Sequence, residues 1–348
     1  MSELRALTAA ARALREARQP FVSALVVAVN GSGYRKAGAR MIATPDQWRA
    51  GSISGGCLER DVTNKGEWYT RAQRSCVVTY DQSEDEGEHG TGCQGVVEVL
   101  IERHTPDHLD ATDYFVTAER CLRDESCAAV VTVVRSSRAD VPLAARLVLR
   151  AGELHTELEP LRIFADVARE LPALPRVVER DGLAVLIETV QPPVHLFVFG
   201  TSHDAVPLVA HAKNLGWTVS VWDASPSSAA RERFPQADHY LTSSVQDAVA
   251  RASRAVRPAA VVMGHHFARD RAALVELLRS RTRYVGVLGA RNRTAQLLDA
   301  VSDAGVELDD ATRARLHAPI GLQIGSETPS EIALSIVAEI QRTYGRAK

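Results

Sequence analysis

Hydrophobic residues follow two different patterns along the chain, and the pattern changes near residue 190. Before that point, short runs rich in valine and leucine alternate with polar turns and a few helical stretches, which is typical of an α+β domain. Helices are predicted at the N-terminus and at residues 58–70 and 113–123. Strands are predicted at residues 21–30, 40–44, 75–80, 96–102, 128–135, 146–150 and 183–190, and we expect them to form a mixed sheet.

From His195 onward, apolar runs of strand length alternate with helical patterns, which predicts a Rossmann-like, doubly wound parallel sheet. A Pro-Pro pair inside residues 188–195 separates the two patterns. We therefore predict an α/β chain of two domains, residues 1–190 and 191–348. The strands predicted in the second domain are 195–199, 218–222, 259–263 and 284–288, and the helices are 205–215, 244–252 and 269–279.

Composition narrows the class of protein. The chain has 348 residues, 45% of them hydrophobic, and a formal charge of −2, which argues against broad electrostatic binding to nucleic acid or to an anionic membrane. No apolar run is long enough to span a bilayer. The five cysteines are scattered without a CxxC pair, so we expect neither a disulfide framework nor a structural zinc site. This use of cysteine is what we expect of a protein in a reducing cytoplasm.

Residues 51–61, GSISGGCLERD, carry the first candidate chemistry. The glycines, including Gly55 and Gly56, permit a sharp turn, and Ser54 can cap a helix that starts there. Cys57 would then lie in the first turn, where unpaired N–H groups and the helix dipole favour its thiolate and can also hold phosphate. The alternative is a buried, inert cysteine beside an ordinary turn.

A second candidate site follows the first strand of the parallel sheet, in the turn GTSHDA at residues 200–205. Compared with the dinucleotide-binding pattern G-x-G-x-x-G/A, it keeps Gly200 and ends in alanine, but Ser202 replaces the middle glycine. A side chain at this position keeps the backbone away from a pyrophosphate, which weakens the prediction of dinucleotide binding. Asp223 ends the next strand, where an acid can bind ribose hydroxyls.

Further polar residues follow the later strands. In doubly wound sheets ligands bind beyond the carboxyl ends of the strands, so these loops can converge on one crevice. The candidates are His203, His265, His266, Gly289, Arg291 and Arg293. Thr328 opens a capping box, Thr-Pro-Ser-Glu, whose helix start is also an anion site. The alternatives are solvated loop residues and a purely structural cap.

Four ordered stretches together resemble the XdhC/CoxI family, accessory factors of molybdenum hydroxylases such as xanthine dehydrogenase. They are GSISGGCLERDV, HGTGCQGVVEVLIE, VFGTSHDA and APIGLQIGSETPSEIALSIVAEI, which begin at residues 51, 89, 198 and 318. The resemblance implies a factor that binds the molybdenum cofactor and assists its sulfuration and insertion into a hydroxylase. It also supports Gly289 and Arg291 as motif positions.

Under this hypothesis Cys57 and Cys93 meet the metal, since two thiols can bind molybdenum, carry a persulfide or form a transient disulfide. The crevice with Gly200, His203, Asp223 and Arg291 would hold the pterin or nucleotide part. We expect a molybdenum hydroxylase as partner, a cysteine desulfurase as a second one, and a homodimer. Two alternatives stay open: an NAD(P)-dependent oxidoreductase on the same fold, and a docking module that uses its Rossmann domain only as a scaffold.

Overall fold

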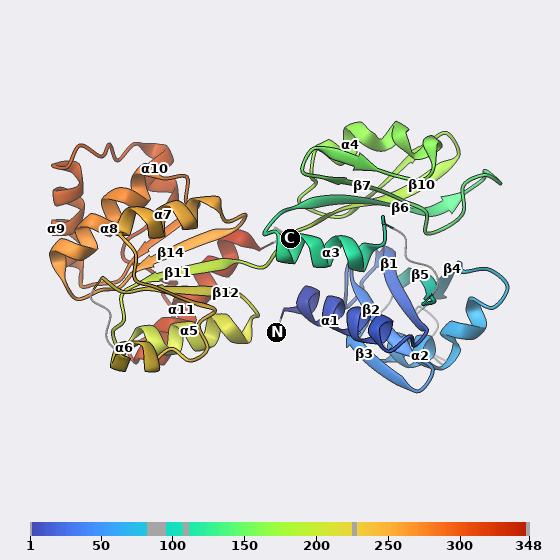
Figure 1. The fold of residues 1–348 in the computed structure, drawn as a ribbon, viewed down its shortest axis with the longest axis horizontal. Coiled ribbons are helices and arrows are strands. Elements are labelled where there is room, and N and C mark those ends of the chain that lie inside the picture. The colour runs from blue at the N-terminus through green and yellow to red at the C-terminus, as the bar shows by residue number, and fades with distance from the viewer. Residues whose placement is uncertain (1, 82–94, 107–110, 225–227, 346–348) are drawn as a thin grey trace. The chain divides into compact units, whose positions relative to one another are not determined.

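The computed structural model describes residues 2–81, 95–106, 111–224 and 228–345. The chain divides into an N-terminal unit, Glu3–Pro192, and a C-terminal unit that holds Pro193–Lys348 (Figure 1). Each unit has its own hydrophobic core. Within the described ranges, no helix combines the length and the apolar character needed to cross a membrane.

Two five-stranded sheets form the N-terminal unit. The first has the order β3-β2-β1-β5-β4 and the second the order β8-β7-β6-β10-β9. The strands of the first sheet are β1 (Phe21–Gly31), β2 (Arg40–Thr44), β3 (Gln47–Gly51), β4 (Ser75–Asp81) and β5 (Gly95–His104). The strands of the second are β6 (Ala128–Ser136), β7 (Arg146–Arg150), β8 (Glu153–His155), β9 (Arg176–Arg180) and β10 (Leu183–Val190).

The expected mixed sheet is wrong, because all pairings recorded between these strands are antiparallel. β-propensity identifies strands but carries no information on their partners. β1, for example, pairs along its length with β5, so that Phe21 lies opposite His104. An antiparallel pair can be closed by a short turn, whereas a parallel pair needs a long crossover. The rest of the predicted fold class, an α+β unit followed by a parallel Rossmann-like sheet, is confirmed.

The two sheets face each other, and one helix covers the outer face of each (Figure 1). Alternate residues of a strand point to opposite faces, so Leu25 of β1 meets Leu186 of β10 while Val26 packs under a helix on the other side. The helices are α1 (Glu3–Glu16), α2 (Cys57–Tyr69), α3 (Tyr114–Arg123), the 3₁₀ helix η1 (Glu159–Phe164) and α4 (Ala165–Arg169). Helix α2 covers the first sheet and α4 the second. Two further helices, α1 and α3, pack with residues of both sheets.

The C-terminal unit is a six-stranded parallel sheet with the order β13-β12-β11-β14-β15-β16. Its strands are β11 (His195–Phe199), β12 (Thr218–Trp222), β13 (His239–Leu241), β14 (Pro258–Val262), β15 (Tyr284–Val287) and β16 (Leu316–His317). Its helices are α5 (Ala205–Asn214), α6 (Ser228–Glu232), α7 (Val245–Arg254), α8 (Phe267–Arg279), α9 (Arg291–Ser302), α10 (Asp310–Arg315) and α11 (Pro329–Tyr344).

Both faces of this sheet are buried, which explains its uninterrupted apolar strands. Leu196 and Val198 of β11 pack under α5 and α11, whereas Phe197 and Phe199 pack under α7, α8 and α9. The chain order reverses between β11 and β14, and this switch point is where doubly wound sheets bind ligands.

Candidate functional site

Helix α2 begins at Cys57, immediately after the Gly-Ser turn. The carboxylate of Glu59 folds back over this turn and accepts hydrogen bonds from the backbone N–H groups of Ile53, Ser54 and Gly56, at 2.8, 2.7 and 2.9 Å. Burial acts to raise the pKa of Glu59, but the hydrogen bonds from Ser54 and the backbone outweigh it and hold the pKa below its ordinary value. Glu59 therefore already binds three N–H groups of this turn that could otherwise have bound a thiolate or a phosphate.

The Ser54 hydroxyl completes the cap. Its Oγ accepts from the N–H groups of Gly56 and Leu58, at 3.1 and 3.2 Å, and donates its proton in a short hydrogen bond to Glu59. A serine hydroxyl offers one donor and two acceptor sites, so all three are engaged. Cys57 Sγ lies 3.7 Å from this oxygen. Ser54 therefore orders the turn that presents the sulfur and has no proton left to donate to it.

Glu59 is the residue in this turn that our sequence interpretation missed. Its signal was present, because a glycine N-cap at Gly56 followed three residues later by glutamate is the spacing of a capping box. Gly56 has a φ of +130°, a conformation that favours glycine. Gly55 and Gly56 are exposed, and Cys57 is half-buried.

The proposed partner of Cys57, Cys93, lies outside the described residues, so their pairing stays a prediction. Within the described ranges, no group of three or more His, Cys, Asp or Glu side chains is arranged to hold a metal ion. Burial raises the pKa of the Cys76 thiol and raises that of Cys121 to about 11, so these two cysteines are poor candidates for the same chemistry.

In the C-terminal unit, the turn after β11 closes tightly against the end of β14. Gly200 has a φ of +136°, and a Cβ there would lie 2.7 Å from the Met263 carbonyl oxygen and 2.9 Å from Gly264 Cα. Only glycine fits such a position without displacing backbone. Ser202 Oγ donates to the same Met263 oxygen at 3.4 Å. The Ser202 side chain thus bridges the two strands at the switch point.

Asp223 lies at the end of β12 and is buried. Its Oδ2 accepts a 2.6 Å hydrogen bond from the Tyr240 hydroxyl. Burial and this bond both raise the pKa of Tyr240, which therefore keeps its proton. A ribose hydroxyl that bound Asp223 would share the carboxylate with Tyr240. Nearby, Arg233 donates to the Thr201 carbonyl at 2.9 Å and so reaches the turn after β11.

The loops after β14 and β15 lie at the same edge of the sheet. His265 Nε2 lies 3.6 Å from Asp204 Oδ2, so these loops approach the start of α5. Arg293 donates to the buried Asp270 in the first turn of α8 at 2.5 Å. Burial raises the pKa of Asp270 even though Arg293 opposes the shift. Asp270 was not among the predicted residues, because an acid in a first helical turn usually signals only the helix start.

The remaining predicted residues differ in their surroundings. His203, His265, His266 and Arg291 are exposed, and Arg291 is the first residue of α9. A Cβ added to Gly289 would lie 3.4 Å from Arg293 Cδ.

Thr328 Oγ1 accepts a hydrogen bond from the N–H of Glu331 at 3.4 Å, and the Glu331 carboxylate accepts one from the N–H of Thr328 at 3.0 Å. Thr328 therefore forms the expected capping box.

Comparison with known proteins matches both units. Residues 14–81 match a model described as the XdhC and CoxI family, and residues 196–340 match one described as the XdhC Rossmann domain. A Bacillus subtilis protein, named as a probable subunit of xanthine dehydrogenase, is 31% identical over 337 residues, which is 96% of each chain. The uncharacterised protein YqeB of Escherichia coli is 32% identical over 44% of this chain and 28% of its own length.

Among solved structures, a crystal structure named as a xanthine dehydrogenase from Bacillus halodurans superposes with a TM-score of 0.75. It is 29% identical, and the superposition covers 99% of this chain and 96% of that one. The chain therefore belongs to the XdhC and CoxI family.

Proposed function

We propose that this protein is an accessory factor that binds the molybdenum cofactor and assists its sulfuration and its insertion into a hydroxylase of the xanthine dehydrogenase type. The observation that carries the proposal is the match, over 96% of the chain, to the Bacillus subtilis protein named as a probable subunit of xanthine dehydrogenase. We place this activity in the cytoplasm, with a homodimer as the working form and a cysteine desulfurase as the source of sulfur.

The chain has residues suited to the phosphate of such a cofactor and residues suited to its metal. Arg291 is exposed at the edge of the parallel sheet where ligands bind, and a guanidinium offers paired donors to a phosphate. Cys57 offers a soft sulfur ligand of the kind that suits the metal. When bound, the cofactor supplies the molybdenum centre. The residues of this chain bind it, orient it and shield it until a hydroxylase receives it.

A direct test is the small molecule that accompanies the protein. Protein purified from cells that make the molybdenum cofactor is expected to release a pterin phosphate on denaturation, which mass spectrometry identifies. Protein from cells that lack the cofactor pathway is the control and should release none. A nicotinamide dinucleotide in place of the pterin would contradict the proposal.

The strand order of the parallel sheet favours one alternative function, an NAD(P)-dependent oxidoreductase. This order is the one found in dinucleotide-binding folds, and Asp223 ends β12 where a ribose-binding acid is expected. Ser202 argues against it, because its side chain occupies the position at which a glycine backbone normally approaches the pyrophosphate.

Replacing Ser202 with glycine is therefore expected to strengthen binding of NAD and NADP by roughly tenfold, since the backbone can then approach the pyrophosphate. Isothermal titration of both dinucleotides measures the change. Ser202→Ala is the matched control, because it removes the hydroxyl and keeps the Cβ, so its binding should stay weak. Tight dinucleotide binding by the wild type, unchanged in Ser202→Gly, would favour the oxidoreductase instead.

A further inference from the structure

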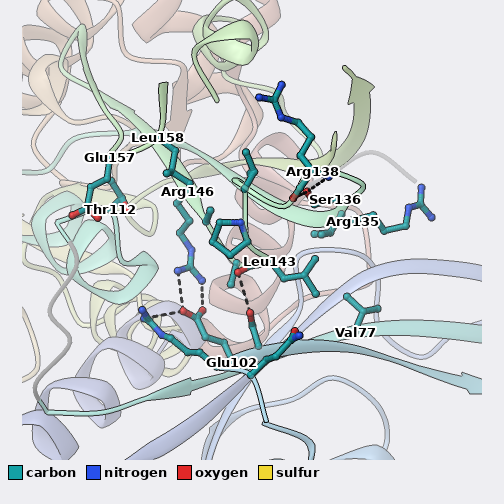
Figure 2. Close-up of a pocket in the computed structure, with 18 of the residues that line it drawn as sticks. Val77, Glu102, Thr112, Arg135, Ser136, Arg138, Leu143, Arg146, Glu157 and Leu158 are labelled. Atoms are coloured by element: carbon teal, nitrogen blue, oxygen red, sulfur yellow. Dashed lines mark hydrogen bonds and ion pairs between the residues drawn. The ribbon is translucent and has the colours of Figure 1, made fainter. Parts of the chain in front are cut away.

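A cleft of about 1010 Å³ opens between the two sheets of the N-terminal unit (Figure 2). One side is formed by β4 and β5 of the first sheet, and the other by β6, β7 and the segment between them in the second. Much of its lining is apolar: Val77, Val134, Val141, Pro142, Leu143 and Leu158. Ligand pockets are commonly about 300–1,000 Å³ with mainly apolar walls and a few polar groups, and this cleft is at the upper end of that range.

A buried charge cluster forms the inner end of the cleft. Arg146 reaches from the second sheet to Glu102 of the first and donates to both of its carboxylate oxygens (Figure 2). Arg74 donates to Glu102 Oε1 at 3.1 Å. The side chains of Arg146 and Glu102 are only 5% and 3% exposed, whereas Arg74 is 34% exposed. Arg74 is therefore the member of the cluster that a ligand can reach.

The balance of charge at this inner end is positive. Burial acts to raise the pKa of Glu102, but Arg146 and His104 outweigh it, so Glu102 stays ionised. Behind it, His104 Nδ1 lies 3.4 Å from Asp113, and Arg15 lies 3.9 Å from the same carboxylate. Among the residues that line the inner end, two arginines, Arg74 and Arg146, thus face one carboxylate, Glu102. The other carboxylate of the lining, Glu157, is exposed. An anion is attracted to such a site.

The rim of the cleft does not share this excess. Arg138 is paired with Asp140 and Asp181, and Arg135 with Glu179. Figure 2 shows Arg135 and Arg138 turned away from the pair formed by Arg146 and Glu102. Arg138 is about as exposed as Arg74, at 32% and 34%, but its two carboxylate partners offset its charge, whereas Arg74 shares Glu102 with Arg146. The inner end therefore determines which charge the cleft accepts.

We propose that this cleft binds a small organic anion, an aromatic carboxylate or phosphate, with its charged group on Arg74 and its flat apolar body against Val77 and Leu143. Guanidinium forms charge-assisted hydrogen bonds with both anions. The apolar walls supply burial for an aromatic ring. This ligand site is separate from Cys57 and from the edge of the parallel sheet, and it does not depend on the function proposed above.

Calorimetric titration of the full chain with three probes that share one ring system tests the proposal. We expect 1-naphthoate and 1-naphthyl phosphate to bind about tenfold more tightly than neutral 1-naphthol, which is the value of one charge-assisted hydrogen bond. Comparison of the two anions indicates whether a carboxylate or a phosphate is preferred. Arg74→Gln should reduce the affinity of both to that of naphthol. Arg60→Gln, an exposed arginine on α2, is the matched control and should change nothing.

A second variant tests whether the probes bind in this cleft or at another site on the protein. Val77→Phe places a larger side chain inside the cleft and should weaken all three probes, because it occupies the space for their shared ring. Equal affinity for the anions and naphthol, or no saturable binding of either anion, would overturn the proposal. So would anion binding that Arg74→Gln or Val77→Phe leaves unchanged, since the anions would then bind elsewhere.

Discussion

Replacing Cys57 with alanine is expected to abolish activation of an apo molybdenum hydroxylase while the fold is retained. Cys57 is the first residue of α2 and half-buried, and alanine is the best helix former, so the substitution costs the helix little. The sulfur is the part of the side chain that can bind a soft metal. Loss of a direct metal ligand should reduce activation by more than the roughly 10- to 100-fold that is typical when a residue hydrogen-bonded to a metal ligand is removed.

The measurement is the rate at which an apo hydroxylase gains activity when it is mixed with cofactor and with each variant. Cys76→Ala is the matched control, because Cys76 is also half-buried in the same unit and burial raises its thiol pKa. Thermal unfolding of both variants checks the fold. Full activation by Cys57→Ala would remove this residue from the mechanism, even if the protein still carried a pterin.

Four of the six strands of the parallel sheet, β11, β12, β14 and β15, were predicted from sequence, whereas β13 and β16 were missed. The inner strands are buried on both faces, so runs such as those of β11 and β14 are uninterrupted and their pattern is strong. The two edge strands, β13 and β16, are short and only partly buried. β3 was missed, because its sequence QWRAG is mostly exposed and alternates weakly. β3 is recognised only through its pairing with β2, in which Ala43 lies opposite Trp48.

The candidate sites were predictable to the extent that local sequence determines them. The turn at Gly200 follows from a motif, and the cap at Thr328 follows from a spacing of three residues. Asp270 was missed because its partner Arg293 is 23 residues away along the chain. The cleft between the sheets was missed for the same reason, since it depends on Arg146 meeting Glu102 across 44 residues. Such contacts need the tertiary fold.

Glu188 illustrates this limit most clearly. The sequence predicts Glu188 within a strand, residues 183–190, but indicates no partner for its carboxylate. The structure confirms the strand, β10, and shows that Glu188 accepts a 2.6 Å hydrogen bond from Arg40 of β2, a residue 148 positions earlier. A second nitrogen of Arg40 donates to the other carboxylate oxygen. The two side chains are 4% and 6% exposed, so this ion pair joins the two sheets inside the core.

Glu188→Ala is expected to destabilise the N-terminal unit by about 3–5 kcal/mol, because it leaves a buried guanidinium without its counter-charge. The Arg40 guanidinium carbon also lies 3.5 Å from the centre of the Tyr114 ring, a second contact that keeps it in this buried position. Glu179→Ala is the matched control, since Glu179 pairs with Arg135 at 66% and 58% exposure, and exposed pairs contribute about 0–1 kcal/mol. Urea unfolding measures both changes.

A double variant, Arg40→Met with Glu188→Leu, separates the charge from the packing. An apolar pair of similar volume avoids the desolvation cost, so most of the stability lost in Glu188→Ala should return. Hydrogen exchange of the β2 and β10 amides would localise the effect to the contact between the sheets. If Glu188→Ala cost no more than Glu179→Ala, the ion pair would not stabilise this contact. The contact between the two sheets would then depend on the Arg146–Glu102 pair and on apolar residues such as Leu25 and Leu186.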